Sequence, residues 1–300
     1  MILLTGATGN VGSALLRRLV AENVPVRAFV RDPRRLGPER VRVQIALGDL
    51  SDASSFRHAL RGVDTVVHLA AAIRDQGTER ATIEEVNGLG TLRMVRAAER
   101  AGVKRFIFFS AIGASLHSQS RFFRAKAQAE KAVESSDMET TVFTPSIIYS
   151  PGDPWITLLG RLAMLPVVPV SGSGRALYEP IWALDAAGAV MGLLAENGNG
   201  PAAEAHRRIE LAGPERLSYD DIVRTFLNVK DRHRRLMHVP RPLVRWGLKA
   251  VEEVQGSRAF ATWDEAELME IPMVSQRGTA DAEALGVHPL PMEYVLRRGH

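Results

Sequence analysis

Three glycines near the start of the chain, Gly6, Gly9 and Gly12, have the spacing of a phosphate-binding turn. They follow the apolar residues 1–4 and precede residues 13–20, whose pattern suits a helix. The first glycine permits a tight bend, the second lets backbone approach a pyrophosphate, and the third lets helix and strand pack closely. The helix N-terminus adds unpaired N–H groups and a positive dipole end. The sequence therefore predicts a phosphate cradle, with a turn that merely needs glycine as the alternative.

The end of the second expected strand, residues 24–30, indicates which dinucleotide would fit. The residue there meets the adenosine ribose, and a carboxylate would bind the 2′-OH and repel a 2′-phosphate. Arg31 stands at this place and can hydrogen-bond a 2′-phosphate and stack on adenine. The pattern favours NADP(H), with NAD(H) as the second choice. Asp32 would bind a 2′-OH if it turned inward, and Arg31 as a solvated loop charge is the other alternative.

The third expected strand, residues 42–49, ends in Asp49 and Leu50. An aspartate there can accept a hydrogen bond from the adenine amine, and the leucine can cover the ring. A turn aspartate that caps the next helix is the alternative for Asp49.

Strand and helix patterns alternate over the first half of the chain. We expect further strands at residues 64–71, 105–110 and 140–144, and helices at 54–61, 88–101 and 124–135. This alternation predicts an α/β fold, a doubly wound, Rossmann-like parallel sheet with helices on both faces. Ligands of such sheets bind at the carboxyl ends of the strands.

The second half is less regular and predicts a smaller C-terminal substrate or partner lobe. We expect helices at residues 183–196, 218–227 and 242–254, and a short strand near 208–211. The predicted division is a dinucleotide-binding domain at 1–150, with return segments near 176–212, and a lobe at 151–300. The apolar segment 155–170 is too short and too interrupted by proline and arginine to span a bilayer, and it suits a buried helix and loop or a pocket wall.

Composition excludes several classes of protein. The chain has no cysteine, which rules out thiol catalysis and fits a reducing compartment. Its net charge of +4 comes with no dense basic run between aromatic residues, so nucleic acid is not expected as a partner. The histidines lack metal-ligand spacing, so no metal site is expected. We expect a cytoplasmic protein without a leader or a transmembrane segment.

Taken together, the motifs resemble the short-chain dehydrogenase/reductase superfamily in its atypical and extended branches. The resemblance is closest to proteins related to the nucleotide-binding accessory subunit of respiratory complex I, with NmrA-like proteins as neighbours. It covers most of the chain and rests on an ordered series of motifs: Thr-Gly-Ala-Thr-Gly-Asn-Val-Gly at 5–12, Gly-Asp-Leu at 48–50, His-Leu-Ala-Ala at 68–71, Val-Asn-Gly-Leu-Gly-Thr at 86–91, Phe-Phe-Arg-Ala-Lys at 122–126 and Pro-Ser-Ile-Ile-Tyr-Ser-Pro-Gly-Asp at 145–153.

The resemblance implies a set of residues that contact the cofactor along its whole length. These are Gly6, Thr8, Gly9, Asn10, Val11, Arg31, Asp49, Leu50, Leu69, Ala70, Ala71, Lys126, Pro145 and Ile148.

The resemblance also shows that the usual proton donor is missing. Active members carry a Tyr-x-x-x-Lys pair on one helix face, in which the phenol transfers a proton and the lysine lowers its pKa and holds the ribose. The matching pair here is Phe122 and Lys126, and a phenyl ring has no exchangeable proton.

Other members of the catalytic set are present in part. Asn87 matches a helix asparagine that supports the proton relay, and Ser110 or Ala111 matches the helper serine. Tyr149 follows the sixth strand and could transfer a proton, although a packing role is the alternative. The catalytic candidates are therefore Lys126, Asn87, Ser110 and Tyr149.

The sequence is compatible with three functions, and it does not decide whether the chain is an enzyme. The first is an NADP(H)-dependent oxidoreductase acting on a small apolar carbonyl or quinone-like compound. The second is a non-catalytic NADP(H)-binding redox sensor or assembly protein with a protein partner. The third, a nucleotide-sugar epimerase or dehydratase, is disfavoured because its chemistry relies on the missing tyrosine.

Overall fold

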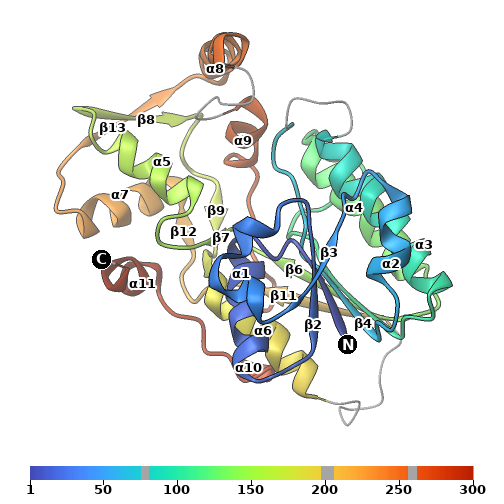
Figure 1. Cartoon of the computed structure of the whole chain (residues 1–300). Helices are drawn as coiled ribbons and strands as arrows, with labels where there is room; N and C mark the ends of the chain where they lie inside the picture. The colour runs from blue at the N-terminus through green and yellow to red at the C-terminus, as the bar shows by residue number, and fades with distance from the viewer. Residues whose placement is uncertain (76–80, 197–205, 256–261, 300) are drawn as a thin grey trace.

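A single parallel sheet organises the chain (Figure 1). The computed structural model describes residues 1–75, 81–196, 206–255 and 262–299. Seven strands pair in the order β11-β6-β5-β4-β1-β2-β3, every neighbouring pair being parallel. They are β1 (Ile2–Thr5), β2 (Val26–Val30), β3 (Gln44–Leu47), β4 (Thr65–His68), β5 (Arg105–Phe109), β6 (Glu139–Pro145) and β11 (His206–Leu211). The expected doubly wound α/β fold is confirmed.

Helices cover both faces of this sheet because its central strands are apolar on both sides. Leu3 and Leu4 of β1 point to opposite faces and belong to two separate cores. One core lies under α1 (Asn10–Ala21) and α6 (Ala183–Ala195). The other lies under α2 (Phe56–Ala59), α3 (Gly90–Arg100) and α4 (Arg121–Glu134). The strand order reverses between β1 and β4: the chain runs outward from β1 through β2 to β3 and then continues from β4 on the other side of β1. Such sheets bind ligands at this reversal point.

Several boundaries differ from the sequence expectation. The helix expected at 88–101 is preceded by a π-helical turn, η4 (Glu85–Leu89), and only then becomes α3. The third strand is shorter than expected, and short 3₁₀ segments, η1 (Pro33–Val41) and η2 (Ala53–Ser55), flank it. The helix expected at 124–135 begins one turn earlier, at Arg121.

The strand expected near 208–211 is β11, which pairs with β6, so this segment does return to the main sheet. Residues 197–205 of the expected return region lie outside the described residues. The helix α10 (Ala280–Ala284) packs beside β11.

The rest of the second half surrounds a third apolar core. Its helices are α5 (Pro154–Leu162), α7 (Tyr219–Val229), α9 (Trp263–Leu268) and α11 (Met292–Arg298). Its strand pairs are β8 (Val167–Ser171) with β13 (Arg235–Val239), β7 (Ile148–Tyr149) with β10 (Ile181–Trp182), and β9 (Leu177–Tyr178) with β12 (Leu217–Ser218). The apolar segment 155–170 thus forms most of α5 and β8.

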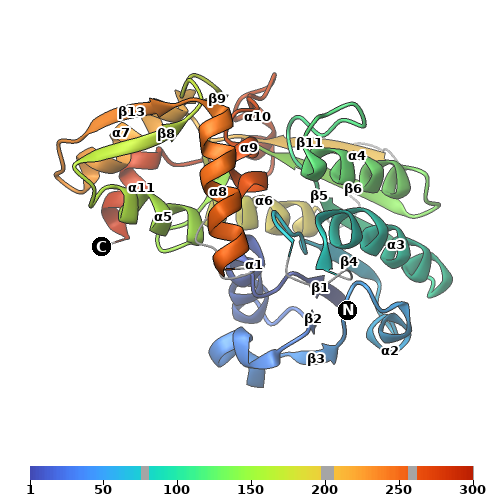
Figure 2. The same ribbon diagram turned by 90° about the horizontal axis from the view of Figure 1, so that it is seen from above.

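The helix α8 (Arg241–Gln255) lies on the outside of the molecule and packs against α9 (Figure 2). Among the described residues, no helix is long and apolar enough to cross a membrane.

Candidate functional site

The glycine turn joins β1 to α1 with almost no free space. Gly6 has a φ of +68°, and a Cβ on it would lie 2.6 Å from the backbone nitrogen of Ala70. A Cβ on Gly12 would lie 2.0 Å from the carbonyl oxygen of Gly6. The Gly9 N–H donates to that same carbonyl, at 2.9 Å. The first and third glycines are therefore required by this backbone path.

The start of α1 has the properties of an anion site. Gly9 is the N-cap and offers no side chain to the first-turn N–H groups, and no acidic residue stands in that turn. Thr8 is partly buried, and Val11 is buried in the core. The Asn10 amide donates to the Asp153 carboxylate at 3.3 Å, which ties the cradle to the start of α5. The cradle thus fits a dinucleotide phosphate on its backbone geometry.

The adenine side of the expected site contains an arginine facing an aspartate. The Arg31 guanidinium lies 3.9 Å from Asp49 Oδ2, and both side chains are substantially exposed. Asp32 accepts a hydrogen bond from the backbone N–H of Arg34 and caps η1. The other oxygen of Asp49 accepts from the backbone N–H and the hydroxyl of Ser51, each at 2.9 Å. Asp49 therefore shapes a turn and still presents Oδ2 toward Arg31, whereas the helix cap that the alternative assigned to Asp49 is made by Asp52.

Leu50 is buried in the second core, where a Cβ added at Gly90 would lie 3.0 Å from the leucine Cβ. Its packing against the start of α3 explains why a leucine follows Asp49.

A chain of hydrogen bonds runs under the cradle from β1 to η4. The Ala70 N–H donates to Thr5 Oγ1, which lies 2.9 Å from His68 Nδ1. On the other side, His68 Nε2 lies 3.0 Å from Thr91 Oγ1, which donates to the Asn87 carbonyl. Because Thr91 uses its proton there, we assign the imidazole proton to Nε2 and an acceptor role to Nδ1.

Burial keeps the imidazole of this chain neutral. It lowers the pKa of His68 from 6.5 to about 3, and the nearby charge of Lys126 adds to that shift. Sequence reasoning missed this role, although a histidine inside an otherwise apolar strand was the available signal.

Asn87 uses its side chain to hold the loop after β4. Its Oδ1 accepts from the Ala72 N–H at 2.9 Å, and its Nδ2 donates to the Ala72 carbonyl at 2.7 Å. This loop also contains Leu69 and Ala70, which are partly buried, and Ala71, which is exposed. The oxygen and the nitrogen of the Asn87 amide are thus both engaged with Ala72. These contacts describe a residue that positions the loop, and its part in a proton relay stays a prediction.

Lys126 belongs to α4, and its side chain places a buried amine at the end of β5. Its Nζ donates to the Phe109 carbonyl at 2.6 Å and lies 4.8 Å from the ring centroid of Phe108 and 5.8 Å from that of Phe122. Burial lowers the pKa of Lys126 from 10.5 to about 7, and the Glu130 carboxylate opposes the shift. The amine can therefore carry or lose a proton near neutral pH.

Ser110 directly follows the carbonyl that Lys126 binds, so the structure brings these two candidates together. Its hydroxyl is buried and has no hydrogen-bond partner within the part of the chain described. Ala111, the alternative match to the helper serine, is also buried. Pro145, at the end of β6, accepts a hydrogen bond from the Ile112 N–H, which fixes this loop beside it.

Tyr149 lies apart, inside the third core. It is fully buried, and its hydroxyl has no hydrogen-bond partner among the described residues. Burial raises the pKa of the Tyr149 phenol well above its usual range, and the charges of Asp185 and Glu215 add to this. Ile148, beside it in β7, packs against the first core. These surroundings match the packing alternative for Tyr149 and give no support to proton transfer by it.

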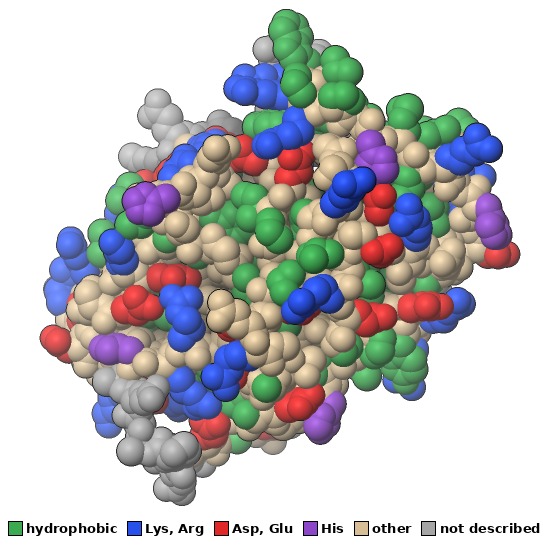
Figure 3. All heavy atoms as spheres, turned by 180° about the vertical axis from the view of Figure 1, so that it is seen from behind, with side chains coloured by type: hydrophobic (Ala, Val, Ile, Leu, Met, Phe, Trp, Pro, Cys, Tyr) green, Lys and Arg blue, Asp and Glu red, His purple; other side chains and the backbone are tan. Residues whose placement is uncertain are grey.

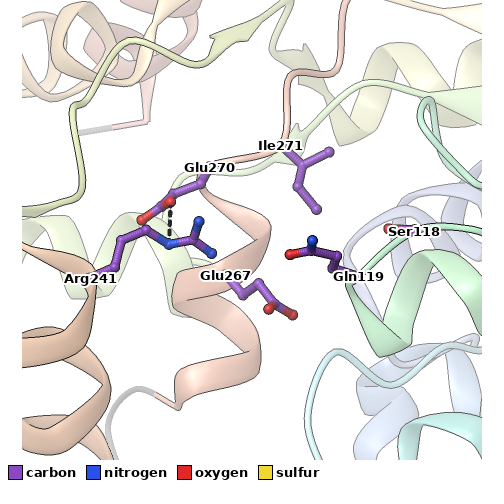
Figure 4. Close-up of a pocket in the computed structure, with 6 residues that line it drawn as sticks. All are labelled: Ser118, Gln119, Arg241, Glu267, Glu270 and Ile271. Carbon is purple, nitrogen blue, oxygen red and sulfur yellow. Dashed lines mark ion pairs between the residues drawn. The ribbon is translucent and has the colours of Figure 1, made fainter.

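A cleft of about 250 Å³ opens between the loop before α4 and the second half of the chain (Figure 4). Its lining residues are Ser118, Gln119, Arg241, Glu267, Glu270 and Ile271. The Arg241 guanidinium pairs with Glu270 at 2.7 Å, and Ile271 packs in the same apolar core as Phe122. The cleft therefore lies at the loop that leads into α4, the helix that carries Phe122 and Lys126.

The parallel sheet, its reversal point and the glycine cradle define a dinucleotide-binding protein. Comparison with known families then matches residues 6–157, about half of the chain, to the NAD(P)H-binding family. The chain belongs to this family, and its cofactor is a nicotinamide dinucleotide. The expected superfamily resemblance is confirmed.

Several known proteins are similar to this chain over part of their own length. Sterol demethylase protein B of Methylococcus capsulatus is 33% identical over 179 residues, 53% of this chain and 55% of that protein. NADH dehydrogenase (ubiquinone) 1 alpha subcomplex subunit 9 of Arabidopsis thaliana is 26% identical over 251 residues, 80% of this chain and 60% of that protein. NAD(P)H azoreductase of Xenophilus azovorans is 34% identical over 146 residues, 48% of this chain and 47% of that protein. The chain thus spans about half to three fifths of these relatives.

Among solved structures, a nucleoside-diphosphate-sugar epimerase from Staphylococcus aureus superposes with a TM-score of 0.76 at 18% identity, covering 99% of both chains. This likeness shows the fold.

Proposed function

We propose that the chain is an NADP(H)-dependent reductase of a quinone-like compound, in which Lys126 holds the cofactor ribose and no tyrosine supplies a proton. The observation that carries this proposal is the pair formed by Lys126 and Phe122, where a buried amine of pKa about 7 lies beside a phenyl ring. The cofactor supplies a hydride when it is bound. The residues we propose to hold it are those named from the resemblance, from the cradle to Ile148.

The preference for NADP(H) is supported by what surrounds Arg31. Asp32, the residue that would favour a 2′-OH, is engaged as the cap of η1. Arg31 is about half exposed, so a 2′-phosphate can reach it. Calorimetry of Arg31→Ala should show a much larger loss of NADPH affinity than of NADH affinity. The exposed Arg61→Ala is the control, and equal loss for both cofactors would remove the 2′-phosphate role.

Because position 122 has no phenol, the site suits one class of hydride acceptor better than another. Hydride addition to a ketone or aldehyde leaves a strongly basic alkoxide, which needs a positioned acid, and losing such an acid costs about a hundredfold to ten-thousandfold. Hydride addition to a quinone leaves a weakly basic hydroquinone anion, which takes its proton from water. A site with Phe122 and a partly protonated Lys126 therefore suits quinone-like acceptors better than simple carbonyls.

The test is NADPH oxidation by the purified protein with a series of quinones, aldehydes and ketones. Oxidation with quinones and none with saturated ketones supports the proposal. Tight NADPH binding with no oxidation by any acceptor would favour the second reading, a non-catalytic NADP(H)-binding redox sensor or assembly protein.

That second reading has its own support. Phe122 removes the usual acid, and the plant relative is named as a subunit of an NADH dehydrogenase, so a protein partner belongs to this alternative. The third reading, an epimerase or dehydratase, has only the fold on its side, since the same phenol is required for its chemistry.

We also propose that residues 1–150 with β11 and α6 hold the dinucleotide. The remaining lobe contributes the residues that contact the substrate, including those of the cleft beside α9.

A cytoplasmic location is part of this proposal, supported by the absence of cysteine from the sequence.

A further inference from the structure

We propose that Glu130 is a positioning residue that keeps the Lys126 amine protonated where it meets the cofactor ribose, and that Arg208 holds Glu130 in place. Lys126 and Glu130 stand four positions apart in α4, so their side chains leave the same face of the helix. Both residues are buried, Lys126 being 3% exposed and Glu130 7% exposed. The ribose contact belongs to the proposed function, and this part of the inference rests on it.

Glu130 is held from β11, the strand at one edge of the sheet. Arg208 of β11 donates to Glu130 Oε2 at 2.6 Å and to Glu134 Oε1 at 3.2 Å. The helix α4 lies along this side of the sheet, next to β6 and β11 (Figure 2). Glu130 Oε1 is buried and has no hydrogen-bond partner within the described part of the chain. One carboxylate oxygen is thus fixed by the arginine, and the other is left buried without a donor.

Such a carboxylate acts strongly on a nearby buried amine, because little water screens the two charges. Burial lowers the pKa of Lys126 to about 7, and the Glu130 carboxylate opposes this shift. The other groups around the amine compete weakly. His68 of β4 is neutral, and the Arg208 guanidinium is about half exposed, so water screens its charge. On the face drawn in Figure 3, basic and acidic side chains lie interspersed, so exposed charges there are balanced by neighbours and by water.

The charge of the amine determines how many donors the ribose can meet. An ammonium group has three N–H donors, and Lys126 uses one of them on the Phe109 carbonyl, at 2.6 Å. Two donors then remain for ribose hydroxyls, whereas a neutral amine would keep only one. Glu130 therefore strengthens cofactor binding near neutral pH without contacting the cofactor.

The test measures the titration of Lys126 in the full chain by NMR. The sequence contains five lysines, so lysine labelled with a carbon isotope at Cε gives few signals, and Lys126→Met identifies the one of interest. Its midpoint should lie near pH 7 in the parent. Glu130→Gln should lower the midpoint by about one pH unit, because the amide keeps the shape and loses the charge. Glu134→Gln removes the exposed partner of the same arginine and should titrate like the parent.

A second variant guards against damage to the fold. Glu130→Gln with Arg208→Gln removes both charges of the pair and leaves no unpaired guanidinium. Its midpoint should fall in the same direction, because the buried carboxylate acts on the amine more strongly than the half-exposed guanidinium does. The affinity for NADPH, measured by calorimetry at pH 7, should fall several-fold in Glu130→Gln and stay unchanged in Glu134→Gln.

The proposal is overturned if Glu130→Gln titrates with the midpoint of the parent, or if Glu134→Gln lowers the midpoint as far. It is also overturned if the midpoint falls while the NADPH affinity at pH 7 keeps its parent value. A lowered midpoint and weaker NADPH binding, in a protein that oxidises NADPH with no quinone, would support the role of Glu130 and contradict the proposed reductase alone.

Discussion

His68 illustrates how one polar residue is accommodated inside an apolar strand. Its two ring nitrogens meet Thr5 and Thr91, so the neutral ring is satisfied, whereas a charged ring would need a second acceptor in a dry site. The threonines are unremarkable in the sequence, because their role appears only when β1, β4 and α3 come together. A sequence pattern therefore cannot identify this group as one unit.

We predict that His68 makes the protein sensitive to acid. Its pKa is about 3 in the folded chain and near 6.5 in the unfolded chain, so between these values only the unfolded state binds the proton. The stability that the neutral ring contributes is complete above about pH 6.5 and is lost as the pH falls toward 3. In urea unfolding, His68→Asn should lose less stability than the parent between these limits. The exposed His58→Asn is the control and should follow the parent.

Lys126 gives a dependence of the same sign in a higher pH range, because its folded-state pKa is also lowered. Its pKa is about 7 when folded and near 10.5 when unfolded, so its charge costs stability most below pH 7, and this cost disappears as the pH rises toward 10.5. The melting temperature of Lys126→Met relative to the parent should therefore fall between about pH 6 and about pH 9. Lys131→Met, an exposed lysine on the same helix, should show no such trend. A constant difference for Lys126→Met would mean that the buried amine does not titrate in this range.

At the scale of elements, the cradle between β1 and α1 is the part that sequence spacing predicted best. Glycine spacing, an apolar strand and a helix pattern are all local signals, and the structure needs Gly6 and Gly12 for close backbone contacts. The π turn η4 was not predictable in the same way. It accompanies the two hydrogen bonds between Asn87 and Ala72, which depend on a loop fifteen residues earlier in the chain.

We predict that Gly12→Ala damages both the fold and cofactor binding. The new Cβ would lie 2.0 Å from the Gly6 carbonyl, so α1 must move away from the turn, and we expect a destabilisation of about 1–3 kcal/mol. Thermal unfolding and NADPH titration measure the two effects. Gly247→Ala is the matched control, since nothing lies within 4 Å of its Cβ position and alanine favours a helix. Equal behaviour of the two variants would refute the close packing of β1 and α1.

At the scale of the whole molecule, the sheet was predictable because each βαβ unit has its own periodic signal, and right-handed crossovers leave few arrangements. The second half was predicted only in outline. Its core joins short, separate elements such as β8 with β13, and their pairing depends on contacts between residues about seventy positions apart. The contact of α9 with the start of α4 has no local signal either, since Arg121 pairs there with Asp264 at 3.5 Å, 143 positions further along the chain.

The role of the missing phenol is measured most directly by comparing the parent with Phe122→Tyr in NADPH oxidation with one quinone and one saturated ketone. The parent should reduce the quinone alone. The new phenol should raise ketone reduction by about a hundredfold or more and change quinone reduction little. Ketone reduction by the parent at the rate of the tyrosine variant would contradict it, because the missing phenol would then not determine which acceptor is reduced.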